Sequence, residues 1–242
     1  MAPMSQSADD QDWRAFDGLW NFRPVEAILA NGHRLRPGRL LRSEQPYRLD
    51  ATQRRQLLER YAIGKILDLR TAEECAPTES IDAPRTHLPL PDVSRDPRIA
   101  DGSRNLAGAY RAMLDDHAPT LVRAIDAIGV PTPVLVHCTA GKDRTGIVVA
   151  LTLELVGARR DDIVRDYVES GRRLAALTER ALARGYEPTW RELAPEVLGA
   201  PPAAIITVLE TVKERWGSVD RFLMTFGMTP MRIEAIRSSL IA

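Results

Sequence analysis

Residues 134–146 read Val134-Leu135-Val136-His137-Cys138-Thr139-Ala140-Gly141-Lys142-Asp143-Arg144-Thr145-Gly146. The apolar run that opens this stretch follows a proline-rich turn, and it predicts a buried strand. Residues 145–156 have the length and the residue types of a buried helix. A strand, a tight loop and a helix in this order place Cys138 at the end of the strand and just before the N-terminus of the helix.

The loop between the predicted strand and helix is suited to binding an anion. Helix N-termini expose unpaired N–H groups and the positive end of a dipole, and the same field stabilises a thiolate at Cys138. Arg144, six residues further on, can offer a planar fork to a phosphoryl group. Gly141 lets the backbone turn with its amides inward. We therefore expect Cys138 to act as a nucleophile and Arg144 to act with it, while Thr139, Ala140 and Gly141 bind the substrate.

Two further side chains in this stretch have expected roles. Thr145 should donate its hydroxyl to the sulfur and assist its departure from a covalent intermediate, and His137 should orient the loop rather than act as a base. In-line attack on phosphorus needs positioning and charge stabilisation, so no metal or cofactor is required. A nucleotide-binding P-loop is excluded because Lys142 is followed by Asp143 instead of Ser or Thr. A lone cysteine after a strand is more often a small core residue, but Cys, Gly, Arg and Thr at these offsets favour catalysis.

Apolar runs and helical stretches alternate along the rest of the chain. Further strands are predicted at residues 65–69 and 86–90. Helices are predicted, several of them with N-caps at Asp50, Ser218 and Thr229, over residues 51–61, 104–116, 120–128, 160–174, 202–216, 219–226 and 230–241. This order predicts an α/β fold with a mostly parallel central sheet flanked by helices, and a helical C-terminal part.

Length and composition restrict the organisation and the partners. Of the 242 residues, 1–12 are expected to be disordered and 13–242 to form a single domain, with 175–201 as a helical insertion or flap. The 33 Lys and Arg balance the 33 Asp and Glu, which argues against nucleic acid as an obligatory partner. The histidines show no metal-ligand spacing, so we expect no metal site. The sequence defines no oligomeric state.

The chain shows no targeting or membrane signal. Its first residues lack the basic and apolar regions of a signal peptide. The most apolar stretch, residues 146–158, contains Glu154 and is too short to span a bilayer. Two cysteines are too few for a disulfide framework, and a reducing compartment suits them. We expect a cytoplasmic protein without stable membrane insertion.

On the loop HCTAGKDRTG the sequence resembles the protein tyrosine phosphatase superfamily, whose signature is HC-x5-R-[ST]. More narrowly, it is similar to the bacterial tyrosine/lipid phosphatase group whose loop reads HCxAGKDRTG. Other matching segments are NFR at residues 21–23, RPGRLLRSEQ at 36–45, DLRTAEE at 68–74 and WGSVDRFL at 216–223. Where related chains often carry NFRDxGG, this one has NFRPVEA at residues 21–27 and lacks the two glycines.

The resemblance implies a function and a set of roles. Members of the group act on phosphotyrosine, some also on phosphoserine and phosphothreonine, and several on phosphoinositides. It implies Cys138 as nucleophile through a phosphocysteine intermediate, Arg144 as phosphate clamp, and Lys142 and Asp143 as substrate-facing residues. The substrate would be a phosphorylated protein or a phosphoinositide. Two alternatives are a sulfurtransferase-like enzyme, which the pairing of Arg144 with Thr145 disfavours, and a non-catalytic pseudophosphatase, which would usually lose the cysteine or the arginine.

Several assignments stay open at the level of sequence. The proton donor for the leaving group is either Asp92, which could equally be a solvated turn residue, or Asp143, which could instead hold the loop. Arg70 is expected to support the site by pairing with Glu73 or Glu74. Cys75 is either an ordinary thiol or the partner of Cys138 in a reversible disulfide that protects the nucleophile.

Overall fold

The structure is a computed structural model that describes residues 19–75, 81–100, 105–183 and 199–242. Its sheet has five strands in the spatial order β1-β2-β5-β3-β4. β1 is antiparallel to β2, and the other neighbours pair in parallel. The strands are β1 (Arg23–Pro24), β2 (Leu40–Ser43), β3 (Lys65–Asp68), β4 (Arg85–His87) and β5 (Val134–His137). The predicted α/β fold with a mostly parallel sheet is confirmed.

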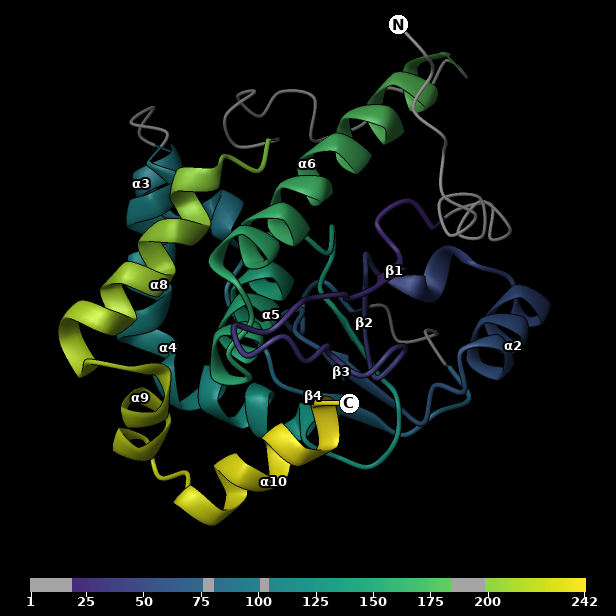
Figure 1. Cartoon of the computed structure of the whole chain (residues 1–242). Coiled ribbons are helices and arrows are strands. Elements are labelled where there is room, and N and C mark those ends of the chain that lie inside the picture. The colour runs from purple at the N-terminus through teal and green to yellow at the C-terminus, as the bar shows by residue number, and fades with distance from the viewer. Residues whose placement is uncertain (1–18, 76–80, 101–104, 184–198) are drawn as a thin grey trace, which may run out of the picture.

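Both faces of the central strands are buried, as continuous apolar runs in parallel sheets require. In β5, Val134 and Val136 belong to one apolar cluster and Leu135 to another. In β3, Leu67 belongs to the first cluster and Ile66 to the second. The helix α2 (Ala51–Arg60) contributes to the second cluster, and α4 (Leu106–Ile128), α5 (Asp143–Leu155) and α8 (Pro202–Trp216) contribute to the first. Figure 1 shows α2 on one side of the sheet and the other three on the opposite side.

The remaining helices are α3 (Pro97–Ala100), α6 (Arg160–Ala183), α9 (Val219–Thr225) and α10 (Pro230–Leu240), with 3-10 turns η2 (Pro46–Arg48) and η3 (Val93–Arg95). The predicted N-caps are confirmed: the side chains of Asp50, Ser218 and Thr229 each accept a backbone N–H of the following turn. The two helices predicted over residues 104–128 are joined in α4. Its backbone is non-helical at His117, where the sequence indicated the break.

The parallel pairing brings the ends of four strands to one edge of the sheet. In the register, His137 lies opposite both Ser43 and Asp68, and Asp68 lies opposite His87. The segments that follow these strands therefore meet at that edge, where open α/β sheets carry their binding sites. They include the loop that begins at Cys138.

Two predictions on the domain organisation concern segments that the described residues cover only in part or not at all. The disordered N-terminus expected at residues 1–12 lies outside the described residues. Of the expected insertion at 175–201, α6 includes the first part up to Ala183, nine residues beyond the predicted helix end, and residues 184–198 lie outside the description. None of the described helices is both long enough and apolar enough to cross a membrane.

Candidate active site

The loop after β5 has its carbonyl groups turned outward. The carbonyl of Thr139 accepts the N–H of Gln45 at 3.1 Å, and that of Lys142 accepts the N–H of Gly146 at 2.8 Å. Side chains donate to the two carbonyl groups that lie between these in the sequence. Asn21 Nδ2 lies 2.9 Å from the oxygen of Ala140, and Arg42 Nη2 lies 2.6 Å from that of Gly141. Because C=O and N–H point to opposite sides of a trans peptide, the N–H groups of residues 140–143 face the inside of the loop. Such a ring of amides is an anion site.

Gly141 meets two requirements that only glycine satisfies. Its φ is +67°, in the left-handed region. A Cβ at this position would lie 2.2 Å from the carbonyl oxygen of Ser43. The loop can therefore pack against the end of β2 only with glycine here, which is the backbone role that the sequence predicted.

A buried cluster of charges holds the outer side of the loop. Asp166 of α6 pairs with Arg42 and, at 3.1 Å, with Arg23, and all three side chains are nearly inaccessible. Arg23 also donates to the carbonyl and side-chain oxygens of Asn21 at 3.1 and 2.5 Å. The NFR and RSEQ motifs therefore act as supports for the loop carbonyls. The sequence did not assign Asn21, Arg23 or Asp166 this role.

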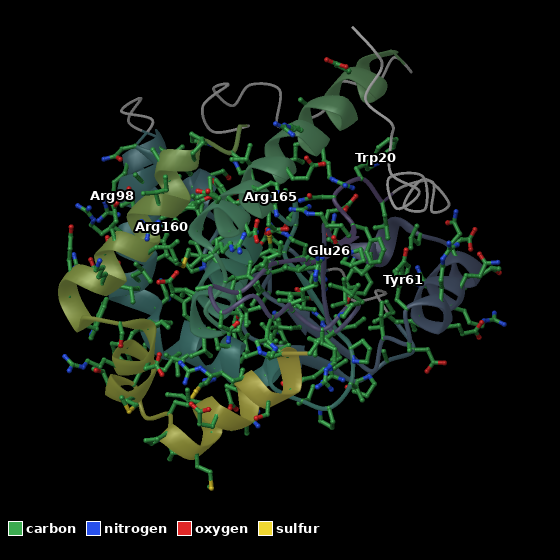
Figure 2. The ribbon with its side chains drawn as sticks, viewed as in Figure 1. Trp20, Glu26, Tyr61, Arg98, Arg160 and Arg165 are labelled. Carbon is green, nitrogen blue, oxygen red and sulfur yellow. The ribbon has the colours of Figure 1, made fainter. Side chains whose placement is uncertain are left out.

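The N-terminal chain is anchored to the segment after β2. The carboxylate of Glu44 accepts the backbone N–H groups of Trp20 and, at 2.9 Å, of Asn21. Trp20 is labelled in Figure 2 near the start of the described chain. This anchor fixes Asn21 where its amide reaches Ala140, and it forms without the glycines that related NFRDxGG segments carry.

Cys138 lies at the base of the loop with only 2% of its surface exposed. The loop runs directly into α5, and no described side chain caps that helix N-terminus. The hydroxyl of Thr145, in the first turn, is buried and has no hydrogen-bond partner among the described residues. The predicted donation of this hydroxyl to the sulfur stays a prediction.

Arg144 is held by a carboxylate that the sequence indicated as a possible partner of Arg70. Its Nη1 lies 2.5 Å from Glu74 Oε2 and its Nη2 lies 2.7 Å from Glu74 Oε1, a bidentate pair. Glu74 Oε1 also accepts the hydroxyl of Thr139. The carbonyl oxygen of Leu90 accepts a further bond from Nη1 at 3.2 Å. The guanidinium is thus fixed by segments that follow β3 and β4, and its orientation depends on Glu74.

The electrostatics of this pair favour full ionisation. Burial raises the pKa of Glu74, but hydrogen bonds from Arg144 and Thr139 bring it down to about 2. Burial lowers the pKa of Arg144, but its bonds to Glu74 and the negative charges of Cys138, Glu74 and Asp92 raise it above its usual range. The charges of Cys138 and Asp92 therefore both act on the same guanidinium.

The two candidate proton donors belong to different elements, η3 and α5. Asp92 caps η3, where its Oδ1 accepts the N–H and the hydroxyl of Ser94 at 3.0 and 2.9 Å. Its side chain is 27% exposed. Asp143 begins α5, and its Oδ1 accepts the hydroxyl of Tyr110 at 2.6 Å. The contacts with Ser94 fit the alternative that Asp92 is a turn residue, and the contact with Tyr110 fits the alternative that Asp143 holds the loop.

Lys142 is directed away from the solvent. Its Nζ donates to the carbonyl oxygen of Gly199 at 2.9 Å and lies 3.3 Å from Asp143 Oδ1. Only 3% of the residue is exposed. The substrate-facing role that the resemblance implies for Lys142 and Asp143 stays a prediction, since these contacts tie both side chains to the protein.

A second buried ion-pair cluster lies below the loop, and it corrects the predicted partner of Arg70. Arg70 Nη2 pairs with Asp68 Oδ2 at 2.9 Å, and Arg85 Nη2 lies 2.6 Å from the same oxygen. Arg70 reaches Glu74 through the backbone carbonyl, at 3.2 Å. Its pairing with a Glu73 or Glu74 carboxylate was therefore the wrong expectation: the Glu74 carboxylate belongs to Arg144, and the Asp68 carboxylate is two residues from Arg70.

His137 is fully buried between the loop and this cluster. Its Nδ1 lies 3.2 Å from the carbonyl oxygen of Cys138, and its Nε2 lies 3.6 Å from Asp68 Oδ2. Burial lowers the pKa of His137 to about 4, although Asp68 opposes the shift. At neutral pH a neutral imidazole therefore donates to the first carbonyl of the loop, which agrees with an orienting role.

This burial predicts an acid-dependent loss of stability. Because the pKa of His137 is about 4 in the folded protein and about 6.5 when unfolded, the unfolded state binds more protons between those values. The free energy of unfolding should therefore fall by about 3 kcal/mol between pH 7 and pH 4 from this residue alone. Asp68 and Glu74, whose pKa values are lowered to about 2, lose most of their contribution below pH 4.

Urea unfolding of the wild type and of His137→Asn at several pH values measures this effect. The difference in unfolding free energy between the two proteins should shrink by about 3 kcal/mol as the pH falls from 7 to 4. His33→Asn, at an exposed position, is the control and should change nothing. A pH-independent difference between wild type and His137→Asn would contradict the buried neutral imidazole.

One trio of described residues has ligand atoms close enough for a metal ion: Asp68, Cys75 and His87, within 4.8 Å of one another. Asp68 is already paired with Arg70 and Arg85, however. A cation bound there would face two guanidinium groups, so the trio is better explained as part of the ion-pair cluster.

The geometry is thus an amide-lined loop around a buried cysteine, with an arginine clamped across it, and sequence comparison agrees. The model of the tyrosine phosphatase family matches residues 14–242. The chain belongs to the tyrosine phosphatase family. It is a cysteine-dependent phosphatase, as the sequence predicted.

Relatives match this phosphatase over most of their length. The triple specificity protein phosphatase PtpB of Mycobacterium tuberculosis is 34% identical over 276 residues, covering 94% of this chain and 99% of that protein. A Cupriavidus necator protein with a tyrosine-protein phosphatase name is 30% identical and covers 92% of this chain and 86% of its own. The core catalytic domain of the PP-IP phosphatase SIW14 from S. cerevisiae superposes with a TM-score of 0.42 at 19% identity, covering 71% of this chain and 87% of that chain.

Proposed function

We propose that this phosphatase hydrolyses phosphate monoesters by transferring the phosphoryl group to Cys138 and then to water. The observation that carries the proposal is the ring of inward N–H groups at residues 140–143 around the buried Cys138. Four outward carbonyls maintain that ring, with partners from β2, from Gln45 in the segment after β2, from α5 and from the N-terminal segment. Such a preorganised set of donors stabilises the charge of the phosphoryl oxygens without reorganisation during the reaction.

Arg144 adds the second group of donors. Its Nη1 and Nη2 are engaged by Glu74, while its Nε has no hydrogen bond among the described residues. We assign that edge of the guanidinium to the phosphoryl oxygens. Sulfur attacks phosphorus in line, the bond from phosphorus to the leaving oxygen breaks, and that oxygen takes a proton. Water then attacks phosphorus, the bond from sulfur to phosphorus breaks, and the thiolate returns.

A metal-free assay tests this function. With EDTA present, the enzyme should release phosphate from p-nitrophenyl phosphate, vanadate should inhibit competitively, and acid quenching during turnover should trap phosphate on Cys138. A sulfurtransferase would release no phosphate, and a pseudophosphatase would bind vanadate without turnover. Either result would refute the proposal.

For the proton donor we favour Asp92. The segment that contains it contacts Arg144 through the Leu90 carbonyl, and the Asp92 charge acts on the Arg144 guanidinium. A carboxyl group there is close to the phosphoryl group that Arg144 would bind. Both aspartates have one oxygen engaged, Asp92 by Ser94 and Asp143 by Tyr110, so the preference rests on the influence of the Asp92 charge on Arg144.

Asp92→Asn should therefore lower kcat by about 100-fold on phenyl phosphate, which needs a protonated leaving group. The loss on p-nitrophenyl phosphate should be much smaller, because its leaving group is a stable anion. The basic limb of the pH–rate profile should disappear on phenyl phosphate. Asp96→Asn, in the surface pair with Arg98, is the matched control. Equal losses on both substrates would contradict the assignment.

The substrate proposal is phosphotyrosine, with phosphoserine, phosphothreonine and phosphoinositides as further classes. The positive charge of Arg144 beside the amide-lined loop supports anionic phosphate substrates. The printed name of the PtpB relative, a triple specificity phosphatase, supports a broad range. Cytoplasmic action is proposed because Cys75 and Cys138 are both free thiols. A panel of phosphopeptides and phosphoinositides, compared by kcat/KM, tests the choice.

A further inference from the structure

A chain of buried hydroxyls ends on the phosphate loop. Tyr110 of α4 and Tyr167 of α6 have their hydroxyl oxygens 2.8 Å apart, and 0% and 1% of the two residues is exposed. Tyr110 donates to Asp143 Oδ1 at 2.6 Å. A phenol has one proton to donate, so Tyr110 gives its proton to Asp143 and accepts that of Tyr167. The chain therefore has one direction, toward the carboxylate.

Both phenols keep their protons at neutral pH. Burial raises the pKa of Tyr110 and of Tyr167, and the negative charge of Asp143 raises both further. Tyr110 is thus a permanent donor in a dry site, where a hydrogen bond to a charged group is stronger than in water. Packing fixes the geometry, since a Cβ on Gly146 of α5 would lie 2.9 Å from the Tyr167 ring.

The donors on Asp143 determine which oxygen can react. Oδ1 accepts from Tyr110 and lies 3.3 Å from the ammonium of Lys142. A carboxylate supported in this way is suited to accept a proton rather than to deliver one, and Oδ2 is the oxygen left to do so. The side chain is 22% exposed, so water reaches part of this carboxylate, and its backbone N–H belongs to the amide ring of the loop.

Building on the proposed function, we propose that the Tyr167–Tyr110 hydroxyl chain positions Asp143 as the proton acceptor of the second half-reaction. Water attacks the phosphorus of phosphocysteine, its proton goes to Asp143 Oδ2, the bond between phosphorus and sulfur breaks, and the electron pair returns to Cys138 as thiolate. Tyr110 and Tyr167 are positioning residues, and Asp143 is the catalytic residue that they orient. Asp92 and Asp143 then serve different half-reactions.

The burst phase of p-nitrophenyl phosphate hydrolysis distinguishes the two half-reactions. If the second step slows, phosphocysteine accumulates, and one p-nitrophenolate per active site appears before the steady state. For Tyr110→Phe we expect kcat about 10-fold lower, a burst close to one equivalent, and a burst rate constant within about 3-fold of wild type. Asp143→Asn should show the same burst with a larger loss of kcat. Tyr167→Phe should give a burst with a loss of about 3-fold.

Tyr61→Phe is the matched control, since Tyr61 lies beside α2 and packs on Phe22 (Figure 2). It should behave as wild type. A double-mutant cycle tests the route of the effect: Tyr110→Phe should cost nothing further in the Asp143→Asn background.

Three results would overturn the proposal: unchanged kcat in both tyrosine variants, a fall in kcat without a burst, or losses that multiply in the double variant. The competitive Ki for inorganic phosphate shows whether the loop itself has shifted, and it should stay within about 2-fold of wild type in all variants. Failure of the proposed function would look different, because the wild type itself would then show neither vanadate-sensitive turnover nor trapped phosphocysteine.

Discussion

Cys138→Ser should abolish the turnover of p-nitrophenyl phosphate, with a loss on the order of 10⁵-fold or more. A serine hydroxyl stays protonated in this site and is a weak nucleophile without an adjacent base. His137, the neighbouring imidazole, donates to the Cys138 carbonyl and has a pKa of about 4, so it is poorly placed to activate a serine. The chemistry therefore depends on the thiolate.

The same variant should keep its affinity for inorganic phosphate, because the amide ring and Arg144 are unchanged. Steady-state kinetics and calorimetric titration with phosphate measure the two effects separately. Cys75→Ser is the matched control and should retain activity within about 3-fold. It also tests the alternative in which Cys75 forms a protective disulfide with Cys138, since peroxide should then oxidise Cys138 irreversibly in the Cys75→Ser variant. Turnover that survives Cys138→Ser would contradict the mechanism.

The loop and its immediate surroundings could be predicted from the sequence because the signal there is local. An apolar run, a glycine and an arginine at fixed offsets determine a strand, a left-handed turn and a helix start, and Gly141 adopts that turn with φ +67°. The same holds for the caps at Asp50, Ser218 and Thr229. Each depends on residues within one turn of the chain.

The supports of the loop could not be predicted because their partners are distant in sequence. Asn21 reaches Ala140 across 119 positions, and Arg42 reaches Gly141 across 99. Periodicity carries no information on such pairs, since they depend on strand order. The parallel register of β2, β3 and β5 brings these segments together. The only indication available from the sequence was the general tendency of binding sites to lie at the ends of parallel strands.

The assignment of Arg70 shows how sequence proximity misled. Glu74, four residues from Arg70, was one of the two carboxylates expected to pair with it, but β3 and β5 are neighbours in the sheet. Their following segments therefore meet, and Glu74 reaches Arg144 instead, 70 positions away. The signal available in the sequence was a carboxylate, Glu74, in the segment that follows β3, the strand beside β5 and its catalytic loop.

Glu74→Gln should lower kcat/KM by about 10³-fold, although Glu74 is not expected to touch the substrate. The bidentate pair fixes both Nη atoms of Arg144, at 2.5 and 2.7 Å, and so orients the Nε edge toward the loop. An amide has only one acceptor oxygen and repels one Nη with its NH₂ group. The guanidinium should then rotate toward other acceptors, such as the Leu90 carbonyl that it already contacts.

The adjacent Glu73→Gln, at an exposed position, provides the matched control and should leave kcat/KM unchanged. The pH dependence is a second test. Because the pKa of Glu74 is about 2, the clamp is ionised above about pH 4, so the acid limb of the wild-type kcat/KM profile above that pH cannot come from Glu74. Glu74→Gln should therefore lower the whole profile without moving this limb. A variant that keeps wild-type kcat/KM and phosphate affinity would show that Arg144 is oriented by the loop alone, and a shifted acid limb would show that Glu74 itself titrates during the reaction.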